Sequence, residues 1–512
     1  MIKKSYIISI DQSTSSTKAL LFDEEGNLLA RTHVDHHQYY PQEGWVEHDA
    51  EEIYDNMVKA IGDLTLNGVT LRNSHLQAEA GIRQFSISIT NQRETVVVWN
   101  KETGKPIANA VVWQDTRGAE LCRRLRQDEK IASMVMEKSG LLLDPNFSAS
   151  GVRWLLDHVA NAQNDAQEGR LLLGTIDTWL IWKLTEGKTF ATDTTNASRT
   201  MLFNIHTMQW DDDLLRLFNI PRSMMPEVLP CDAIYGETTV EGLFKSPITI
   251  AGVLGDSHGA LVGQTCFREG LGKVTYGTGS SVMINIGQQP LYAPKGLVTS
   301  VAFSAFGKHF YAYEGNIYST GATLKWMADQ LQLVGHPAEM EQLATSVPDN
   351  GGVYIVPAFS GLGAPWWQSD VKAAIVGLTF ASTKAHVVRA ALESIAYQIK
   401  DLVDVMRNSP SSSESSSESA QGDSLFADGG PTKNEFLMQF QADMLQTPIV
   451  CTEVDDASAL GAVMMNGFAR GIWKTTDDVT HLRKVVRTYT PHDIASRNAL
   501  YEGWLHAVRT IT

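Results

Sequence analysis

Short apolar runs that end in small polar residues recur along the chain and indicate β-strands followed by loops. Residues 6–11 (YIISID) form such a run, and the polar loop QSTSST separates it from a second run at residues 19–23 (ALLFD). The same order returns where residues 273–275 (KVT) lead into the loop YGTGSS and the run VMIN at residues 282–285. These patterns predict β-hairpins. Two hairpins with hydroxyl-rich turns, roughly half a chain apart, indicate duplicated domains that face one cleft.

Other segments have the apolar spacing of packed helices. They include residues 175–184 (TIDTWLIWKL) and residues 392–406. Further along, residues 425–427 (LFA) are strand-like, residues 428–430 (DGG) predict a turn, and a helix is expected to begin around Asn434. The mixture of strands and helices predicts an α/β fold.

The length of the chain predicts two domains. At 512 residues it exceeds the size near which a single core stops growing, about 250–300 residues. We expect an N-terminal domain at residues 1–247 and a C-terminal domain at residues 248–512. Residues 408–424 (NSPSSSESSSESAQGDS) are too rich in polar side chains to bury much surface, and we expect a mobile insertion there.

Charge and cysteine content argue against several classes of function. The chain carries 58 acidic and 42 basic residues, so binding to nucleic acid or to anionic lipid is not expected. The four cysteines show no CxxC spacing, which argues against a zinc site and a disulfide framework. We recognise no signal sequence and no apolar run long enough to insert into a membrane. We therefore expect a cytoplasmic protein.

The two hairpin loops carry groups that suit phosphate binding. In the loop DQSTSSTK, the hydroxyl groups of Ser13, Thr14 and Ser15 and the charge of Lys18 can surround phosphate oxygens. In YGTGSS, the glycines on both sides of Thr278 free the backbone for the same task. Loops of this composition are more often ordinary turns. Their significance therefore depends on the acidic residues that accompany them.

Two aspartates stand where ligands bind in open α/β sheets. Asp11 ends the first apolar run, and Asp256 follows the apolar run at residues 248–254. Phosphoryl transfer needs a metal anchored by carboxylates and a base or aligner for the acceptor hydroxyl. One aspartate can hold Mg²⁺ and the other can accept the proton. A turn or a helix cap is the alternative interpretation of either residue.

A third candidate group follows the strand-like residues 85–90 (FSISIT). Adjacent Arg93 and Glu94 offer donors beside a pair of acceptors, which suits neighbouring hydroxyl groups. The alternative is a surface ion pair of little energetic value. Trp113 is one of twelve tryptophans, most of which are expected in the core, and such a side chain can also pack against a substrate carbon chain.

With these residues assembled, the chain resembles the FGGY carbohydrate kinases from its first strand to about Trp504, apart from the serine-rich insertion. The members that phosphorylate glycerol are the most similar. The resemblance implies two RNase H-like domains of the actin and hexokinase type that flank a cleft for ATP and substrate, and it suggests a homodimer or homotetramer. Five stretches carry it: GWVEHDAEEI from Gly44, ITNQRETVVVW from Ile89, DTWLIWKLT from Asp177, NASRTMLFNIHT from Asn196 and VPAFSGLGAPWW from Val356.

The resemblance also implies roles for individual residues. Asp11 corresponds to the aspartate associated with Mg²⁺, and Asp256 corresponds to the catalytic base. Arg93 and Glu94 match the clamp on the acceptor hydroxyls, and Trp113 matches a wall of the acceptor pocket. The positions that match nucleotide contacts of the family are Thr14, Thr278, Gly321, Gly430 and Asn434.

The chain departs from the family pattern in its acceptor pocket. Asn146 stands where Tyr is typical, Ser257 where a Gln follows the catalytic aspartate, and Ser281 where a Phe follows the YGTG loop. All three changes remove bulk, which favours a longer or more hydroxylated acceptor. Lys18 stands where Arg is common, which keeps the charge and loses the bidentate fork. Glycerol is the default acceptor, and erythritol, another tetritol or pentitol, or a ketopentose is the alternative.

Two other classes of protein share parts of this pattern. An actin-like ATPase uses similar phosphate loops, and a catalytically silent polyol sensor can arise from a changed pocket. Arg93 and Glu94 beside Asp256 argue against the ATPase, and the intact pair of Asp11 and Asp256 argues against the sensor. The expected activity is phosphorylation of a primary hydroxyl group on a small polyol or sugar, with ATP and Mg²⁺ as cofactors.

Overall fold

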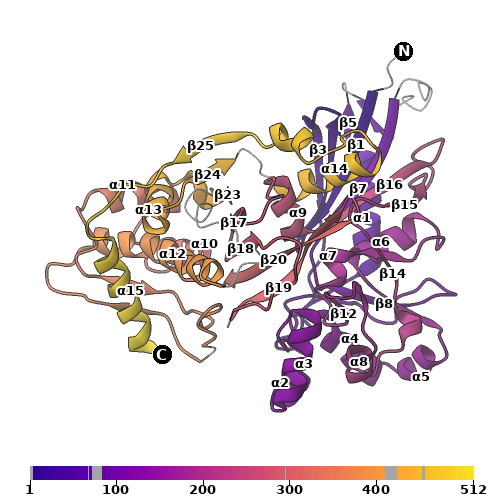
Figure 1. Ribbon diagram of the computed structural model, residues 1–512, viewed down its shortest axis with the longest axis horizontal. Coiled ribbons are helices and arrows are strands. Elements are labelled where there is room, and N and C mark those ends of the chain that lie inside the picture. The colour runs from indigo at the N-terminus through magenta and orange to yellow at the C-terminus, as the bar shows by residue number, and fades with distance from the viewer. Residues whose placement is uncertain are drawn as a thin grey trace. The chain divides into compact units, whose positions relative to one another are not determined.

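The computed structural model describes residues 4–66, 69–71, 83–294, 296–368, 370–409, 424–452 and 456–512 (Figure 1). The chain divides into two compact units. Unit 1 comprises Met1–Thr265, Thr299–Tyr311 and Asp456–Leu482, and unit 2 comprises Cys266–Val298, Ala312–Asp455 and Arg483–Thr512. Each unit combines a β-sheet with helices, as the sequence predicts. Most of the expected serine-rich insertion, residues 410–423, lies outside the described residues.

Unit 1 contains a six-stranded sheet with its parallel strands in the middle. The order is β15 (Ile234–Thr238), β16 (Ile248–Gly255), β7 (Arg83–Asn91), β1 (Lys4–Gln12), β2 (Ser16–Asp23) and β3 (Leu28–Asp35). β7 runs parallel to both β1 and β16, whereas β2 and β3 continue antiparallel from β1. Because parallel strands end at the same edge, the residues after β1, β7 and β16 meet there.

Apolar helices pack onto this sheet. α1 (Ala50–Asp63) contacts β2 and β3, and α14 (Ala457–Ala469) contacts β16, β7, β1 and α9 (Asp256–Gly263). The side chain of Asp49 caps α1 by accepting the N–H of Glu51. The core that results includes Ile8, Ile10 and Ile87, which are fully buried.

Unit 2 contains most of a second sheet, which includes the second predicted hairpin. The sheet has seven strands, in the order β19 (Val298–Ala305), β20 (Lys308–Ile317), β18 (Ser280–Asn285), β17 (Gly272–Tyr276), β23 (Leu425–Gly429), β24 (Ile449–Thr452) and β25 (Val485–Tyr489). All of β19 except Val298 belongs to unit 1. β17, β23 and β24 are parallel, and the outer strands are antiparallel. Of β20, only the part from Ala312 onward belongs to unit 2.

The helices of unit 2 extend the sequence prediction. α12 (Lys384–Arg407) contains the predicted helix at residues 392–406 and begins earlier, at a capping box formed by Thr383 and His386. α13 (Glu435–Leu445) packs against α12. Its start matches the predicted helix near Asn434.

Six strands of each sheet correspond in order, which supports the predicted duplication. In each series an antiparallel meander of three strands is followed by two parallel strands and one antiparallel edge strand. The second sheet has an additional strand, β19, beside β20. The corresponding series are β3-β2-β1-β7-β16-β15 and β20-β18-β17-β23-β24-β25. The predicted hairpins are the pairs β1–β2 and β17–β18.

The compact units are not divided at the predicted position between residues 247 and 248. β16 and α9 belong to unit 1 because β16 pairs with β7 in the first sheet. α14 also belongs to unit 1, although it lies close to the C-terminal end of the chain. Sequence order alone cannot reveal that α14 packs back onto unit 1, because this packing joins residues several hundred positions apart.

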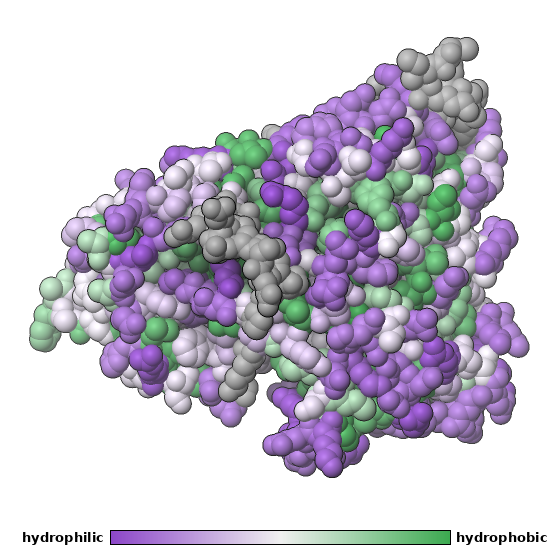
Figure 2. Space-filling view, in the orientation of Figure 1, coloured by the Kyte–Doolittle hydropathy of each residue, from purple (hydrophilic) through white to green (hydrophobic). Residues whose placement is uncertain are grey.

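The visible surface is mainly hydrophilic. Figure 2 shows hydrophilic residues over most of the face in view, with hydrophobic residues in small scattered areas. Among the described residues, we find no helix that combines the length and the apolar character needed to cross a bilayer.

Candidate active site

The first candidate acid, Asp11, lies at the end of β1 in a cluster of charges. It pairs in register with Lys18 on β2, and Lys18 Nζ lies 3.4 Å from Asp11 Oδ2. The same amino group lies 2.9 Å from Oδ1 of Asp456, the residue that precedes α14. Arg31 Nη1 lies 3.4 Å from Oδ2 of Asp456. Sequence reasoning found Asp11 and Lys18 and missed Asp456, which carries no motif and lies far along the chain.

Burial raises the pKa of Asp11 to about 6. Lys18 opposes this rise, and the charges of Asp256 and Asp456 add to it. The ordinary pKa of an aspartate is about 3.9, so burial disfavours the charged form of Asp11, and two neighbouring carboxylates add to this effect. A cation at this position would favour the charged form. We find no group of three or more metal-binding side chains among the described residues, but Mg²⁺ commonly needs only one or two carboxylates together with substrate phosphates. Asp11 fits that role.

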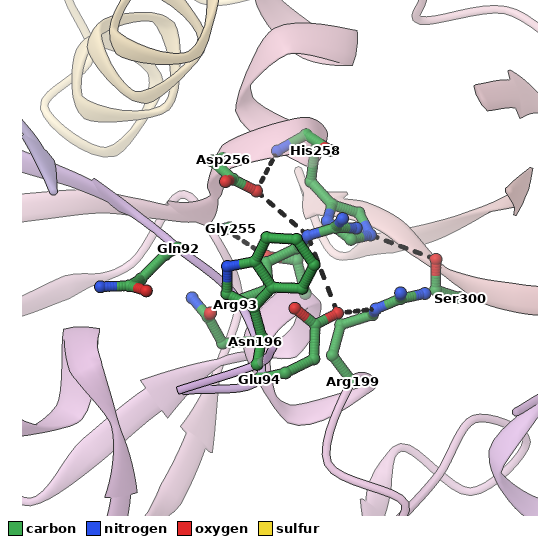
Figure 3. A network of polar contacts seen from close by, with 12 residues as sticks. Gln92, Arg93, Glu94, Asn196, Arg199, Gly255, Asp256, His258 and Ser300 are labelled. Carbon is green, nitrogen blue, oxygen red and sulfur yellow. Dashed lines mark hydrogen bonds and ion pairs between the residues drawn. The ribbon is translucent and has the colours of Figure 1, made fainter. Parts of the chain in front are cut away.

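The second candidate acid, Asp256, begins α9 directly after β16. Its Oδ1 lies 3.1 Å from Nε of Arg93, which follows β7 on the neighbouring strand (Figure 3). The Arg93 side chain is buried, whereas the Asp256 side chain is 38% exposed and is therefore accessible to a ligand. The backbone N–H of Ser257 donates to Asp256 Oδ1 at 2.6 Å. His258 is buried, and its ring nitrogen Nε2 lies 3.2 Å from Ser300 Oγ.

Glu94 lies between two buried guanidinium groups. Arg199 Nε donates to Glu94 Oε1 at 2.6 Å, and Arg93 Nε lies 3.9 Å from the same oxygen (Figure 3). Glu94 has a φ of 65°, a left-handed conformation that is unfavourable for a residue with a side chain. Such strain at a buried charged residue is typical of functional sites. Arg199 was not predicted individually, although it lies within the stretch NASRTMLFNIHT that carries the family resemblance.

Trp113 is close to the first hairpin loop. Its indole Nε1 donates to the Thr14 hydroxyl at 3.0 Å, and its backbone N–H donates to Thr95 Oγ1 at 3.2 Å. Thr14 can still use its own hydroxyl proton toward a ligand. The structure therefore places the predicted acceptor wall beside a predicted phosphate-binding residue.

The other predicted residues of unit 1 lie in or beside these segments. Ser13 closes a tight turn, with its N–H and hydroxyl both directed to the carbonyl oxygen of Ser16. Ser15 is exposed at the tip of the same loop. Asn146 is half-buried and lies two residues before Ser148, whose hydroxyl donates to the Glu94 carbonyl oxygen at 2.7 Å. Asn146 is therefore close in sequence to Ser148, which contacts the clamp directly.

Unit 2 brings together the second set of predicted residues. The carbonyl oxygen of Gly277 accepts the N–H of Gly321 at 3.0 Å, and the carbonyl oxygen of Thr278 accepts the N–H of Ala322 at 3.0 Å. A Cβ atom on Gly321 would lie 2.6 Å from that Gly277 oxygen, so glycine permits this approach. β23 pairs with β17 up to their ends, which brings Gly430 beside the same loop.

The remaining residues of unit 2 have identifiable structural roles. Asn434 caps α13 by accepting the N–H of Leu437 at 2.8 Å. The Ser281 hydroxyl accepts from Nζ of Lys273 at 3.3 Å. Lys273 is fully buried and also donates to Thr275. Sequence reasoning treated this lysine only as part of a strand and missed the buried charge behind the loop.

A pair of buried carboxylates lies elsewhere in unit 1. Asp177, in the first turn of α6 (Ile176–Leu184), accepts hydrogen bonds from the hydroxyl groups of Thr175 and Thr192 at 2.5 and 2.7 Å. Burial and the nearby charge of Asp193 raise the pKa of Asp177 to about 7. Because the folded protein holds this proton more tightly than the unfolded chain does, Asp177 makes folding less favourable as the pH rises toward 7.

The variant Asp177→Asn tests this pH dependence. An amide cannot ionise, so the variant should gain stability relative to the parent protein as the pH increases. We expect the difference in unfolding free energy to grow by about 2 kcal/mol from about pH 5 to about pH 8. Urea denaturation followed by circular dichroism measures it. A difference that does not change with pH would contradict the raised pKa of Asp177.

Comparison with known proteins gives matches along almost the whole chain. The model of the FGGY family of carbohydrate kinases, N-terminal domain, matches residues 6–263, and the C-terminal domain model matches residues 272–470. The chain is 44% identical to a glycerol kinase of Shewanella frigidimarina over 100% of this chain and 99% of the relative. It is 45% identical to a glycerol kinase of Gluconobacter oxydans over 99% of this chain and 96% of the relative.

Solved structures give the same result for the fold. The crystal structure of Plasmodium falciparum glycerol kinase with ADP matches with a TM-score of 0.89 and 34% identity, over 100% of this chain and 99% of that chain. A gluconate kinase of Lactobacillus acidophilus matches with a TM-score of 0.86 and 20% identity, over 99% of this chain and 98% of that chain. At that identity, the second likeness concerns the fold alone.

Proposed function

Because the chain belongs to the FGGY family of carbohydrate kinases, we propose that it transfers the γ-phosphate of ATP to a primary hydroxyl group of glycerol, giving glycerol 3-phosphate and ADP. The observation that carries this proposal is the cluster of Arg93, Glu94 and Asp256, in which a partly exposed carboxylate stands beside a buried ion-pair network. The similarity to glycerol kinases over the full chain supports the choice of acceptor.

In this proposal the residues of unit 1 hold and activate the acceptor. Arg93 donates to one glycerol hydroxyl, and Glu94 accepts from a second hydroxyl. Asp256 takes the proton of the terminal hydroxyl as its oxygen bonds to the γ-phosphorus atom, and the bond to the β,γ-bridging oxygen breaks to release ADP. Asp11 would hold Mg²⁺, which when bound neutralises charge on the phosphates. Lys18 adds a positive charge at the same edge of the sheet.

The residues of unit 2 supply a nucleotide site. The loop that contains Thr278 is exposed at the end of β17, Gly321 packs closely against Gly277 of that loop, and Gly430 has open space beside its backbone. Asn434 adds a polar side chain at the start of α13. These residues are proposed to contact ATP. In unit 1, Thr14 and the neighbouring serines of the first hairpin are proposed as separate contacts for phosphate groups.

The variant Gly430→Ala tests the nucleotide site. A Cβ atom on Gly430 would meet no protein atom within 4 Å, and its φ lies outside the left-handed region, so the fold should tolerate alanine. A methyl group there would obstruct only a ligand that approaches the backbone. We expect the KM for ATP to rise about tenfold with an unchanged melting temperature. Gly335→Ala, at another exposed glycine of unit 2, is the control and should leave the KM for ATP unchanged. A Cβ atom there would lie 3.2 Å from Oε1 of Glu339, the end of a flexible side chain that can move aside. An unchanged KM in Gly430→Ala would place the nucleotide elsewhere.

A larger acceptor is the second candidate, and the small side chains of the acceptor pocket favour it. Asn146 and Ser257 are half-buried and leave more room than Tyr and Gln would. Coupled ADP release with glycerol, dihydroxyacetone, erythritol, threitol, pentitols and ketopentoses tests the proposed reaction. The highest kcat/KM for glycerol would support it, and a preference for a four-carbon or five-carbon acceptor would transfer the proposal to that substrate. ADP release that no acceptor stimulates would indicate an ATPase, and binding of a polyol without turnover would indicate a sensor.

The cellular location and the oligomeric state of the enzyme are also proposed. All four cysteines are buried free thiols, which supports a location in the reducing cytoplasm. A homodimer or homotetramer is the assembly that the family resemblance suggests, and light scattering of the purified protein would measure it.

A further inference from the structure

A buried carboxylate beneath the site, that of Asp193, receives an unusual number of hydrogen bonds. Asp193 ends β11 (Ala191–Asp193) and caps the short helix α7 (Thr194–Ala197). Its Oδ1 accepts from the backbone and the side-chain nitrogen of Asn196 at 3.0 and 2.8 Å. Its Oδ2 accepts from the backbone and the hydroxyl of Thr195, both at 2.6 Å, and from Sγ of Cys231 at 3.3 Å. Capping of α7 uses only the two backbone donors, so the side-chain bonds require another explanation.

The first side-chain bond leads to the candidate base. Thr195 donates its single hydroxyl proton to Asp193, which leaves its oxygen free to accept. That oxygen accepts the backbone N–H of Gly255 at 2.9 Å. Gly255 is the N-cap residue of α9 and directly precedes Asp256. The chain of bonds from Asp193 through Thr195 therefore ends at the backbone that carries Asp256.

The second side-chain bond leads to the acceptor clamp. Asp193 fixes the orientation of the Asn196 amide by accepting from Nδ2. The same Nδ2 donates to Asn91 Oδ1 at 2.9 Å, and Asn196 Oδ1 accepts from Asn91 Nδ2 at 3.0 Å. Asn91 Nδ2 also donates to the carbonyl oxygen of Gln92, directly before Arg93. Figure 3 shows Asn196 among Gln92, Arg93, Glu94 and Asp256.

We propose that Asp193 is a positioning residue that aligns two parts of the active site, Asp256 through Thr195 and the Arg93–Glu94 clamp through Asn196. This inference rests on the proposed function, because the two parts act as base and clamp in that reaction. The side chains of Asp193, Thr195, Asn196 and Asn91 are all fully buried. A base held about 1 Å away from its productive position can lose orders of magnitude in rate, which gives the alignment a catalytic consequence.

The surroundings of Asp193 act on its pKa in opposite directions. Burial raises its pKa, and the hydrogen bonds from Thr195 and Asn196 oppose that rise. Asp177 is not an independent control, because its charge and that of Asp193 act on each other. Asp401 in unit 2 provides a control carboxylate. It is buried, and it accepts from the Tyr501 hydroxyl at 2.6 Å and from Trp504 Nε1 at 2.9 Å.

Substitutions in the two arms should have different kinetic effects. Thr195→Val removes the hydroxyl at nearly constant volume and should lower kcat about tenfold, with little change in the KM for the acceptor. Thr195→Ser restores the hydroxyl and should restore kcat. Asn196→Ala should instead raise the KM for the acceptor about tenfold, with a smaller effect on kcat. Asp193→Asn should show both defects, and Asp401→Asn should show neither.

A purely structural role for Asp193 predicts another result. In that case the variants would lower the melting temperature, and those that fold would retain the kcat and KM of the parent protein or lose both in proportion. Either result overturns the proposal. The separation of a kcat effect in Thr195→Val from a KM effect in Asn196→Ala supports it.

Hydrogen exchange separates this inference from the proposed function. The Gly255 N–H should exchange about tenfold faster in Thr195→Val than in Thr195→Ser, whatever the acceptor is. If glycerol is not phosphorylated, the glycerol assignment fails, and the kinetic comparison is made with the acceptor that the panel identifies. Unchanged exchange at Gly255 in Thr195→Val would overturn the alignment of Asp256 by Asp193, even if glycerol is the substrate and even if Asp193→Asn does not fold.

Discussion

Replacing Asp256 by Asn is expected to lower kcat for glycerol phosphorylation by about 10²–10⁴-fold. The amide preserves the volume of the side chain and an oxygen that can face Arg93 Nε, which lies 3.1 Å from the carboxylate. It cannot take the proton of the acceptor hydroxyl. Because Asp256 is not one of the proposed nucleotide contacts, the KM for ATP should change by less than about threefold. Steady-state kinetics with coupled ADP release measures both constants.

The matched control for this variant is Asp232→Asn. Asp232 is a half-buried aspartate of unit 1 whose carboxylate accepts the backbone N–H of Phe306 at 2.8 Å. Its substitution makes the same chemical change outside the candidate site and should leave kcat unchanged. If Asp256→Asn retains a kcat near that of the parent protein, Asp256 is not the base, and the proposed reaction would need another proton acceptor.

Much of the site could be predicted because it follows from local patterns. Asp11 and Asp256 were both identified as acids that follow apolar strands, and the structure places them after parallel strands β1 and β16 on either side of β7. Arg93 and Glu94 follow β7 itself, at the same edge. The apolar runs therefore indicate where strands end at the edge of the sheet. The motif residues that follow them indicate the acids and the arginine that lie at this edge. The family assignment is confirmed by matches to both domain models.

The unpredicted residues share a different property. Asp456 reaches Lys18 across 438 positions of sequence, and Arg199 reaches Glu94 across 105 positions. Neither residue lies in a local pattern that suggests its partner. A buried charge needs a compensating group, so Glu94 is expected to have a basic partner. The sequence alone does not say which arginine is that partner. The return of α14 to unit 1 was missed for the same reason.

The second large effect is expected from Glu94→Gln. Glu94 Oε1 accepts a hydrogen bond from Nε of Arg199 at 2.6 Å, and both side chains are buried. The carboxylate therefore compensates the charge of Arg199 and also offers an acceptor to a glycerol hydroxyl. Gln is nearly the same size, but it is neutral and replaces one acceptor oxygen with an NH₂ donor. We expect kcat/KM for glycerol to fall by about 10²–10³-fold, mainly through a higher KM, because a site built to bind a hydroxyl discriminates strongly when that bond is lost. Titration calorimetry with glycerol measures the binding component directly.

Breaking a buried ion pair also costs stability, typically about 3–5 kcal/mol, so this variant needs a control with a similar structural defect. Glu393→Gln in unit 2 provides one. Glu393 is buried, and its Oε1 accepts from Arg389 Nε at 2.8 Å. Both variants should have lower melting temperatures, but only Glu94→Gln should lose affinity for glycerol. If the two variants lose stability equally and both keep the KM of the parent protein for glycerol, the charge of Glu94 serves the fold, and the acceptor hydroxyls must be recognised by other groups.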